Sequence, residues 1–560
     1  MSIVDRLEDS ICQALKDAAF QAREAGELDF EQLPDFVLEV PRDKSHGDYA
    51  SNLAMLMAKE ARKPPRLIAE LLVKHFRREG NWVAEVEIAG PGFINFRLDP
   101  GWLYQALPLA EEQDTAYGRS NAGQGRKVQV EFVSANPTGL LHMGNARGAA
   151  LGDTIANLLD AAGFYVEKEY YINDAGNQIE NFGKSLEARY LQQFDQDVPF
   201  PEDGYHGEDI IDTVKNIIKR DGDKYLNMDS SLRREFLVKY ALEEKLAHIK
   251  GVLERFGVNY DVWFSEQSLH DSGAVEAAIR ELDANGYVYE KDGALWLKGE
   301  ELGLEKDEVL VRNNGLPTYY AADIAYHRNK LERGFTWMIN LWGADHHSHV
   351  ARMKAALKAL GYDPEQLTVV VMQLVRLFSG GEIVRMSKRT GQYITLSDLM
   401  DEVGKDAARY FFVMRSHDSH LDFDLDLAKE ESGENPVYYV QYAHARICSI
   451  LRQAQEEGIS TKEASRCNLA LLTHPSELEL LRKIADFPVL VREAALALEP
   501  HRLTRYAGEL AGLFHNFYTH CRVLNSEPEL RDARLSLVNG VRITLRNLLT
   551  LIGVTAPERM

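Results

Sequence analysis

Cysteine is scarce in this sequence of 560 residues, and its spacing excludes one class of site. The four cysteines, Cys12, Cys448, Cys467 and Cys521, are scattered and form no Cys-x-x-Cys pair. A zinc site built from cysteine pairs is therefore not expected. Scattered thiols are typical of a reducing compartment, where disulfides are rare, so we expect four ordinary thiols in a cytoplasmic protein.

Long hydrophobic runs are also missing. No stretch of eighteen or more apolar residues occurs, so no membrane-spanning segment is predicted. The first residues, MSIVDRLEDSICQALKDAAF, have the pattern of an amphipathic acidic helix and are not expected to form a signal peptide. The composition is that of a globular protein, and the length predicts about three or four domains.

Basic residues are outnumbered by acidic ones. The chain has 64 Lys and Arg against 86 Asp and Glu, which gives a formal net charge of -22. Phosphate is repelled by a negative surface, so the total charge alone argues against nucleic-acid binding. Any such contact would have to use a locally basic surface.

The segment from residue 128 to residue 174 predicts a βαβ unit. The apolar run 128–133 indicates a buried strand, and Asn136-Pro137-Thr138-Gly139 indicates a turn. A helix is expected from His142 to about Gly163, followed by a strand over 165–172. Because a helix N-terminus presents N–H groups and the positive end of its dipole, this turn suits a phosphate.

The residues at this turn carry a family resemblance. His142-Met143-Gly144-Asn145 stands where class I aminoacyl-tRNA synthetases have their "HIGH" motif, and EFVSANPTGLLHMGN resembles the arginyl-tRNA synthetases in particular. The resemblance implies that His142, Gly144 and Asn145 bind ATP, with His142 and Asn145 donating to its phosphates during catalysis. From the residues alone, His142 is equally explained as a capping or core histidine, and Gly144 as a packing residue.

A second strand, turn and helix are expected in WMINLWGADHHSHVARMKAAL. Asp345 follows the strand, at the edge where open α/β sheets bind ligands. The resemblance implies that Gly343, Asp345, and His347 or His349 hold the ribose and adenine of ATP. Histidines beside an aspartate also suggest a metal site, but this set is imperfect for zinc and no resident metal is predicted.

The segment GGEIVRMSKRTGQ resembles the mobile KMSKS loop of the same class. Arg385 occupies the position of the first lysine, and nearby glycines suit a loop that closes over ATP. The resemblance implies that Met386, Ser387 and Lys388 bind ATP, that Lys388 neutralises the leaving pyrophosphate, and that Mg²⁺ bridges the phosphates.

Two carboxylates point to the amino-acid substrate. Asp323 follows Tyr319 by four residues, so both lie on one face if the segment is helical. A guanidinium is a planar, permanently charged donor that carboxylates bind well. The resemblance implies that arginine is bound by the set Glu131, Ser134, Asn136, Tyr319 and Asp323. The alternatives are that Glu131 pairs with an internal arginine and that Asp323 caps a helix.

Residues 1–112 predict an α+β domain, with helices near 2–25, 47–62 and 65–78 and two strands within 83–98. PRDKSHGDYASNLAM and GPGFINFRL resemble the N-terminal extension of the same family, which contacts the D-loop of the tRNA. Phe93 would then stack on a base and Asn95 would hydrogen-bond it. The alternative is that Phe93 is a core residue.

Residues 406–560 predict an all-α domain that begins with DAARYFFVMRS, which resembles the Asp-Ala-Leu-Arg signature of the family's anticodon-binding bundle. Tyr438 and Tyr442, together with Phe517 and Tyr518, have the side chains to stack on bases, although core packing is expected for most of them. Some basic residues of the central insertion also have the charge to contact tRNA, but charged helix faces are usually only solvated: Lys215, Lys219, Arg220, Arg233 and Arg234.

The resulting prediction is a multidomain α/β protein. A split Rossmann-like catalytic core with a parallel sheet spans 113–405, with a connecting insertion over about 175–305. The resemblance implies an arginine–tRNA ligase that joins L-arginine to its tRNA through an arginyl-adenylate, releases AMP and pyrophosphate, and acts as a monomer. A cysteinyl-type synthetase would need cysteines in this core, and a non-catalytic tRNA-binding relative would fail to exchange ATP with pyrophosphate.

Overall fold

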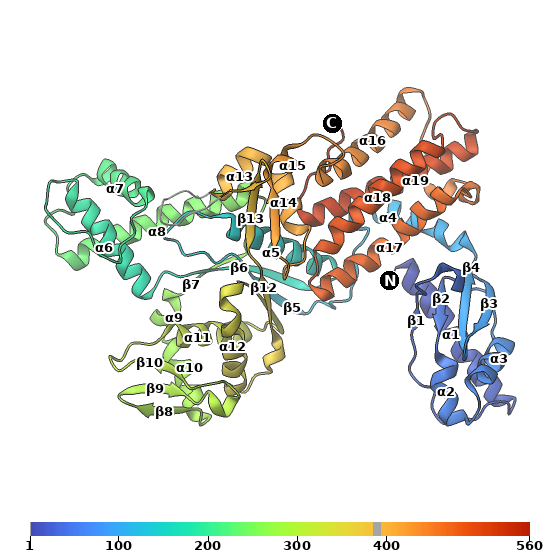
Figure 1. The fold of residues 1–560 in the computed structure, drawn as a ribbon, viewed down its shortest axis with the longest axis horizontal. Helices are drawn as coiled ribbons and strands as arrows, with labels where there is room; N and C mark the ends of the chain where they lie inside the picture. Colours follow the sequence, from blue (N-terminus) through green and yellow to red (C-terminus); the bar gives the residue numbers. More distant parts are fainter. Residues whose placement is uncertain (1, 385–393) are drawn as a thin grey trace.

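The computed structural model describes residues 2–384 and 394–560. Figure 1 shows a small N-terminal domain at one end, a central α/β domain with a helical arm at the opposite end, and a helical bundle packed on the central domain. The predicted Arg385, Met386, Ser387 and Lys388 lie outside the described residues.

The N-terminal domain packs three helices on a four-stranded antiparallel sheet of order β1-β2-β4-β3. Its elements are α1 Ile3–Glu24, β1 Leu38–Glu39, β2 Tyr49–Ser51, α2 Leu53–Ala61, α3 Pro65–His75, β3 Val83–Ala89 and β4 Phe93–Leu98. The helix expected from residue 47 begins later, because residues 49–51 pair with β4. Tyr49 and Ser51 are both buried, which fits a strand more closely than a helix.

Helix α4 (Ala106–Gln113) leads to a five-stranded parallel sheet of order β12-β11-β5-β6-β7. Its strands are β5 Lys127–Glu131, β6 Tyr165–Ile172, β7 Val262–Ser265, β11 Trp337–Gly343 and β12 Leu367–Met372. Helix α5 (Met143–Ala161) connects β5 to β6 and confirms the predicted βαβ unit. The strand order proceeds from β5 to β6 and β7 on one side and from β11 to β12 on the other, so the topological switch point lies between β5 and β11. Ligands are therefore expected at the carboxyl ends of these two strands.

Three details of this core differ from expectation. Strand β5 ends at Glu131 and not at Val133, because Val133 takes a positive φ of 68°. Strand β7 lies inside the range expected to be insertion, yet it pairs with β6 in the main sheet. The apolar run after β12 is a separate strand, β13 (Val375–Ser379), which belongs to another sheet with β14 (Glu382–Ile383) and β15 (Leu421–Asp424).

The remaining elements of the central domain form a helical arm, a second insertion, and the segments that lead back to the sheet and on to the bundle. The helical arm consists of α6 Gly176–Gln192, α7 Glu208–Asp221 and α8 Ser230–Arg255. The second insertion contains α9 Gln267–Asp271, α10 Ala274–Ala284, β8 Val288–Lys291, β9 Ala294–Leu297 and β10 Glu308–Val311. The chain returns through α11 Tyr319–Glu332 and α12 His347–Ala359, and it reaches the bundle through α13 Leu396–Val403, α14 Lys405–Val413 and α15 Leu425–Lys429.

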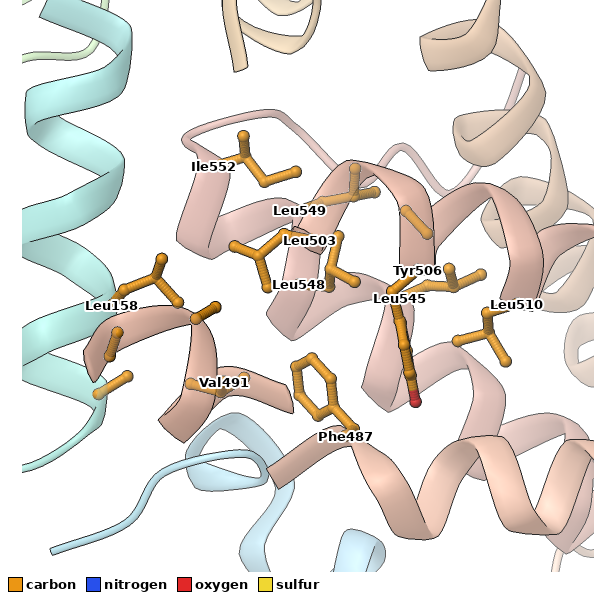
Figure 2. Packing of buried hydrophobic residues seen from close by; sticks show 14 of the residues in the cluster. Leu158, Phe487, Val491, Leu503, Tyr506, Leu510, Leu545, Leu548, Leu549 and Ile552 are labelled. Atoms are coloured by element: carbon orange, nitrogen blue, oxygen red, sulfur yellow. The ribbon is translucent and has the colours of Figure 1, made fainter. Parts of the chain in front are cut away.

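The C-terminal bundle contains α16 Pro436–Glu456, α17 Pro475–Ala497, α18 His501–His520 and α19 Pro528–Ile552. Figure 2 shows Leu158 of α5 beside Val491 of α17, next to the bundle core. Helix α19 is long and apolar enough to cross a membrane by length and composition, but 72% of its most apolar window is buried inside the protein. It is the core helix of this bundle, and it contacts α5 as well.

Arg409 of α14 lies completely buried where three parts of the chain meet. Its guanidinium donates to the carbonyl of Ile552 at 2.7 Å, to the carbonyl of Phe256 at 3.2 Å, and to Asp153 Oδ2 of α5 at 2.6 Å. Gly553, the residue after Ile552, has a φ of 73° and leaves room for this guanidinium, because a Cβ at Gly553 would stand 2.4 Å from the guanidinium carbon of Arg409. The arginine of the predicted Asp-Ala-Leu-Arg signature therefore ties the bundle and the arm to α5.

Replacing Arg409 with lysine is expected to lower the free energy of unfolding by about 2 kcal/mol, because one ammonium cannot reach all three acceptors of the planar guanidinium. Urea unfolding followed by tryptophan fluorescence measures this. Arg376→Lys is the control, since its pair with Asp422 is half exposed and should contribute less than about 1 kcal/mol. Equal losses in the two variants would contradict the junction role.

Candidate active site

The predicted phosphate-binding turn is a capped helix N-terminus. The Gly144 N–H donates to His142 Nδ1 at 3.1 Å, and the His142 N–H donates to Asn145 Oδ1 at 3.0 Å. The capping alternative for His142 is therefore correct as structure. It does not exclude a second role, because a neutral imidazole that accepts at Nδ1 carries its proton on Nε2, where it is able to donate. The amide nitrogen of Asn145 has the same capacity.

Gly144 is needed at this turn for space. A Cβ there would stand 3.1 Å from Cε1 and 3.3 Å from Nδ1 of His142, a contact tighter than side chains normally make. Without a side chain at this position, the imidazole is able to fold over the first turn of α5. Gly144 is exposed at this helix start, whose N–H groups and positive dipole end suit an anion.

The backbone between Glu131 and this turn is strained. Val133 and Ser134 have positive φ values of 68° and 40°. A positive φ is uncommon for any residue other than glycine and is rarer still for a β-branched residue such as valine. The Ser134 N–H donates to the carbonyl of Phe132 at 3.0 Å, and its hydroxyl donates to Glu131 Oε1 at 3.1 Å while accepting from the Tyr171 N–H at 3.1 Å. Such strain of about 1–3 kcal/mol is typical of functional sites. Ser134 thus fixes Glu131.

Glu131 is buried and has an internal cation as its partner. Lys330 Nζ of α11 lies 2.7 Å from Glu131 Oε2, and neither side chain is more than one-tenth exposed. The alternative of an internal ion pair is therefore correct for Glu131, although the partner is a lysine and not an arginine. Both Glu131 oxygens already have one partner each, which limits how the residue can meet a substrate.

Asp323 lies inside α11 and is not a helix cap, since Thr318 caps that helix. One carboxylate oxygen is 3.1 Å from His327 Nδ1 and the other is 2.5 Å from His349 Nε2. Burial opposes its ionisation, but the two imidazoles hold the pKa of Asp323 well below its usual range. Asp323 is therefore ionised at neutral pH.

Tyr319 stands one helical turn before Asp323 and is 44% exposed. The helical spacing expected for this pair is confirmed. The Tyr319 hydroxyl lies beside Gly176 at the start of α6, where a Cβ would stand 3.4 Å from it. Asn136 is exposed on the turn after β5. The candidate arginine-binding residues thus surround one edge of the sheet.

Glu266 is a third acidic residue of this edge, and the sequence reasoning missed it. It directly follows β7, is 3% exposed, and its pKa is raised to about 7 by burial, with a further raising effect from the charges of Asp174 and Asp323. The signal was present in VWFSEQ, where a polar residue follows an apolar run. The prediction that this segment belongs to the insertion hides that signal.

The nucleotide side of the edge follows β11. Gly343 ends that strand, and Asp345 and His347 are exposed just beyond it, at the start of α12. His349 points instead to Asp323, so the structure favours His347 over His349 for contact with ATP. Within residues 2–384 and 394–560, no group of three or more His, Cys, Asp and Glu side chains is arranged to hold a metal ion.

Two aromatic sites suited to bases lie far from this edge. Phe93 and Asn95 alternate along β4 with the fully buried Ile94 and Phe96; Phe93 is half-buried, which leaves both of its predicted roles open, whereas Asn95 is only 5% exposed. On α16 the nearly parallel rings of Tyr438 and Tyr442, 6.3 Å apart, border a cavity of about 400 Å³ lined by Glu431, Ser432, Gly433, Tyr438, Tyr439, Tyr442 and His515.

Core packing was expected for most aromatics of this group, and it holds only for Phe517, which is completely buried. Tyr442 is 39% exposed and Tyr518 is 36% exposed, and the Arg446 guanidinium lies 4.4 Å from the centre of the Tyr518 ring. Tyr438 is half-buried. This face of α16 therefore presents stacking surfaces and a cation together.

The basic residues of the helical arm are mostly paired within the arm. Lys215 contacts Asp212, Arg220 contacts Asp221, and Arg233 is buried against Glu187. These pairs favour the interpretation of a solvated, self-neutralised surface. They leave no described cluster of unpaired cations at the positions where tRNA contact was considered.

The fold and site agree with the comparisons with known proteins. Residues 107–448 match the family model described as "tRNA synthetases class I (R), catalytic domain", residues 5–98 match the arginyl-tRNA synthetase N-terminal domain, and residues 440–560 match the DALR anticodon-binding domain. A parallel sheet with a capped helix start after β5 and a polar turn after β11 is thus the catalytic domain of a class I aminoacyl-tRNA synthetase.

Full-length relatives define the family more narrowly. The chain is 65% identical to the arginine–tRNA ligase of Heliobacterium modesticaldum over 564 residues and to that of Moorella thermoacetica over 560, with 100% of each chain covered. The structure of Thermus thermophilus arginyl-tRNA synthetase matches with a TM-score of 0.74 and 26% identity, over 98% of this chain and 100% of that one. The chain belongs to the arginyl-tRNA synthetases.

Proposed function

We propose that this arginine–tRNA ligase binds the guanidinium of arginine against Asp323 and Glu266. One observation carries the assignment. Asp323 is an ionised, largely enclosed carboxylate whose described partners are imidazoles, and in residues 2–384 and 394–560 no Lys or Arg makes an ion pair with it. Glu266 is buried with a hydrogen bond to the Tyr171 side chain, and burial raises its pKa to about 7, with a further raising effect from the charge of Asp323. A cation is the missing partner of such a pocket.

The other predicted residues take supporting roles in this proposal. Tyr319 covers the arginine side chain, and Asn136 holds its α-amino or carboxylate end. Ser134 contributes by fixing Glu131. Because Glu131 is neutralised by Lys330, it supplies a polar wall and orientation to the amino acid, while the net negative charge comes from Asp323 and Glu266.

The chemistry proposed is in-line attack of the arginine carboxylate on the α-phosphate of ATP. The nucleophile is already ionised, so no general base is required, and catalysis depends on positioning and charge stabilisation. His142, Asn145 and the N–H groups of α5 would stabilise the phosphates, with Gly343, Asp345 and His347 on the nucleoside. Met386, Ser387 and Lys388 retain their predicted role at the pyrophosphate.

Mg²⁺ fits this site as an ion held by ATP. It prefers oxygen ligands and keeps several of its waters, so it does not require a set of protein ligands. The described residues offer no such set. The ion would supply positive charge to the phosphates, and the protein residues would orient them.

In the second half-reaction the 2′-hydroxyl of the terminal adenosine of arginine tRNA attacks the arginyl-adenylate. Phe93 and Asn95 would contact the D-loop region, and Tyr438 and Tyr442 would stack on anticodon bases. We retain residues 1–112, 113–405 and 406–560 as the proposed functional units of a cytoplasmic monomer.

ATP–pyrophosphate exchange tests the proposal, measured with each of the twenty amino acids, with and without total tRNA. Exchange with arginine alone is expected, and a requirement for tRNA would show that the tRNA completes the site. Exchange with another amino acid would contradict the pocket assigned to Asp323 and Glu266. Absence of any exchange would contradict the catalytic roles of His142 and Asn145.

Glu266 makes arginine binding dependent on pH. Its pKa of about 7 means that its carboxylate is mostly ionised at pH 8 and mostly protonated at pH 6. A guanidinium prefers the ionised form, so the KM for arginine is expected to rise about tenfold from pH 8 to pH 6. Initial-rate kinetics measure this, and Glu266→Gln should flatten the profile while raising KM at pH 8.

In the protein without arginine, Glu266 gives the free energy of unfolding the opposite pH dependence to that of arginine affinity. Because the folded-state pKa of Glu266 is raised, the folded chain binds a proton that the unfolded chain releases, and stability falls as pH rises from about 4.5 to about 7. Arginine should therefore raise the melting temperature more at pH 8 than at pH 6. An equal thermal shift at both values would rule out Glu266 as the titrating group.

A further inference from the structure

Lys330 is a completely buried lysine whose role no motif explains. Its ammonium donates to Glu131 Oε2 at 2.7 Å and to Asn340 Oδ1 at 3.0 Å, and it lies 4.2 Å from the centre of the Tyr326 ring. Glu131 ends β5 and Asn340 lies on the neighbouring β11, so the lysine bridges the two strands at the switch point of the sheet.

The contact with Asn340 extends toward the other side of the pocket. Asn340 Nδ2 is 2.8 Å from His327 Nε2, and His327 Nδ1 is 2.8 Å from the Asp323 carbonyl and 3.1 Å from its carboxylate. Asn340 and His327 are both buried. A continuous polar chain therefore joins the two acidic groups, Glu131 and Asp323, which stand 192 positions apart in the sequence.

The direction of each hydrogen bond in this chain follows from Lys330 at one end and Asp323 at the other. An ammonium only donates, so the amide oxygen of Asn340 must face it and the amide NH₂ must face His327. The NH₂ donates, so Nε2 of His327 must accept, and the neutral imidazole then carries its proton on Nδ1. That N–H points at Asp323. The carbonyl and the carboxylate of Asp323 only accept, so they require the same proton on Nδ1, and the two ends of the chain support one neutral form of His327.

We propose that Lys330 is a positioning residue for arginine: through Asn340 it stabilises the neutral Nδ1–H form of His327, which keeps the charge of Asp323 available and oriented toward the guanidinium. The proposal rests on the assignment of Asp323 to the amino-acid pocket. Without the lysine, the Asn340 amide is free to rotate, and Nε2 of His327 loses the donor that stabilises the neutral imidazole. The ring beside the Asp323 carboxylate then takes a second proton at Nε2, and its positive charge competes with the guanidinium for Asp323.

A solely structural ion pair would behave differently. Breaking a buried pair leaves an unpaired charge and lowers stability, and because Glu131 lines the arginine pocket, Lys330→Met alone does not separate the two roles. The orienting role predicts an effect on arginine and not on ATP, and it predicts the same effect from a second break in the chain that keeps the ion pair. Asn340→Leu provides that break, since it leaves Lys330 beside Glu131 and introduces no charge.

The experiment compares Lys330→Met, Asn340→Leu and the control Arg333→Met in the full-length enzyme. Arg333 ends the same helix and pairs with the buried Glu169 of β6 at 2.5 Å, but it makes no contact with Asn340 or His327 among the described interactions. Kinetics are measured separately for arginine and ATP, with the melting temperature recorded for each. Histidine ¹⁵N NMR reports the tautomer of His327, assigned with His327→Gln.

Both Lys330→Met and Asn340→Leu are expected to raise the KM for arginine at least about tenfold, the effect of one lost charge-assisted contact, with the KM for ATP and kcat changed less than about threefold. Both should also lose the single Nδ1–H form of His327. Arg333→Met should lower the melting temperature alone. Wild-type arginine kinetics in Asn340→Leu, or an unchanged His327 tautomer in Lys330→Met, would overturn the proposal.

These outcomes are separable from a failure of the proposed function. If the wild-type enzyme exchanges with arginine but the two variants bind arginine normally, the orienting chain is wrong and the pocket stands. If Asp323→Asn also leaves arginine binding unchanged, the pocket itself is wrong. A variant that fails to fold is identified by its melting temperature, and the other variant then decides.

Discussion

Replacing Asp323 with asparagine is expected to lower kcat/KM for arginine by about three orders of magnitude. The substitution keeps the size of the side chain but removes the negative charge that faces the guanidinium, and truncating one partner of an enclosed charge pair typically costs 2–5 kcal/mol. The asparagine oxygen can still accept from His327, so the loss is chiefly that of the charge. Steady-state ATP–pyrophosphate exchange with varied arginine measures the change.

The effect should fall on KM more than on kcat, because the guanidinium is distant from the reacting carboxylate and binds similarly in ground and transition states. Glu167→Gln is a matched control: its carboxylate is 22% exposed against 26% for Asp323, and it also pairs with a cation, but Arg333 occupies it. Its arginine kinetics should stay within about threefold of wild type. Similar losses in both variants would mean that general electrostatics, and not a specific contact, determine affinity.

The sequence was most informative where function and local periodicity coincide. The strand, turn and helix around His142 followed from an apolar run, turn-forming residues and helical spacing. The pairing of Tyr319 with Asp323 followed from a separation of four residues. Both are short-range regularities, and a single sequence displays them directly.

The misses come from contacts between distant parts of the chain. The partner of Glu131 lies 199 positions away, and nothing near Glu131 or Lys330 distinguishes a substrate-binding carboxylate from a paired one. Glu266 was overlooked because β7 has only four residues and follows a long helical arm, so its membership of the main sheet depends on pairing with β6. Residues 49–51 fit the helical pattern of 47–62 in the sequence, but pairing with β4 holds them extended.

Family resemblance implied roles that these regularities could not, but it did not indicate the charge or the internal partners of the residues that carry those roles. It marked Glu131 as a ligand of arginine without indicating that a lysine already neutralises it. It offered His347 or His349 for ATP, and only the contact between His349 and Asp323 separates them. The pocket's charge, and therefore its pH dependence, is a property of the assembled site.

His142→Ala is expected to lower kcat for arginine activation by about two to three orders of magnitude, the usual cost of losing one donor to developing charge. It should also lower the free energy of unfolding by about 1 kcal/mol, because the side chain caps α5. Activity and stability therefore change together, and a loss of activity alone would not separate the catalytic interpretation from the capping one. Single-turnover formation of arginyl-adenylate and urea unfolding measure the two effects.

His474 provides a matched control within the same chain. It caps α17 with the same geometry: the Ser476 N–H donates to its Nδ1 at 3.2 Å, and its own N–H donates to Glu477 Oε2 at 2.9 Å. His474→Ala should thus lose about 1 kcal/mol of stability and keep its rate of adenylate formation. His142→Asn should recover the cap but not the rate, because an asparagine side chain is too short to place a donor where Nε2 lies. If His142→Asn instead restores activity, capping is the only role of His142, and phosphate stabilisation must come from Asn145 and the helix N–H groups.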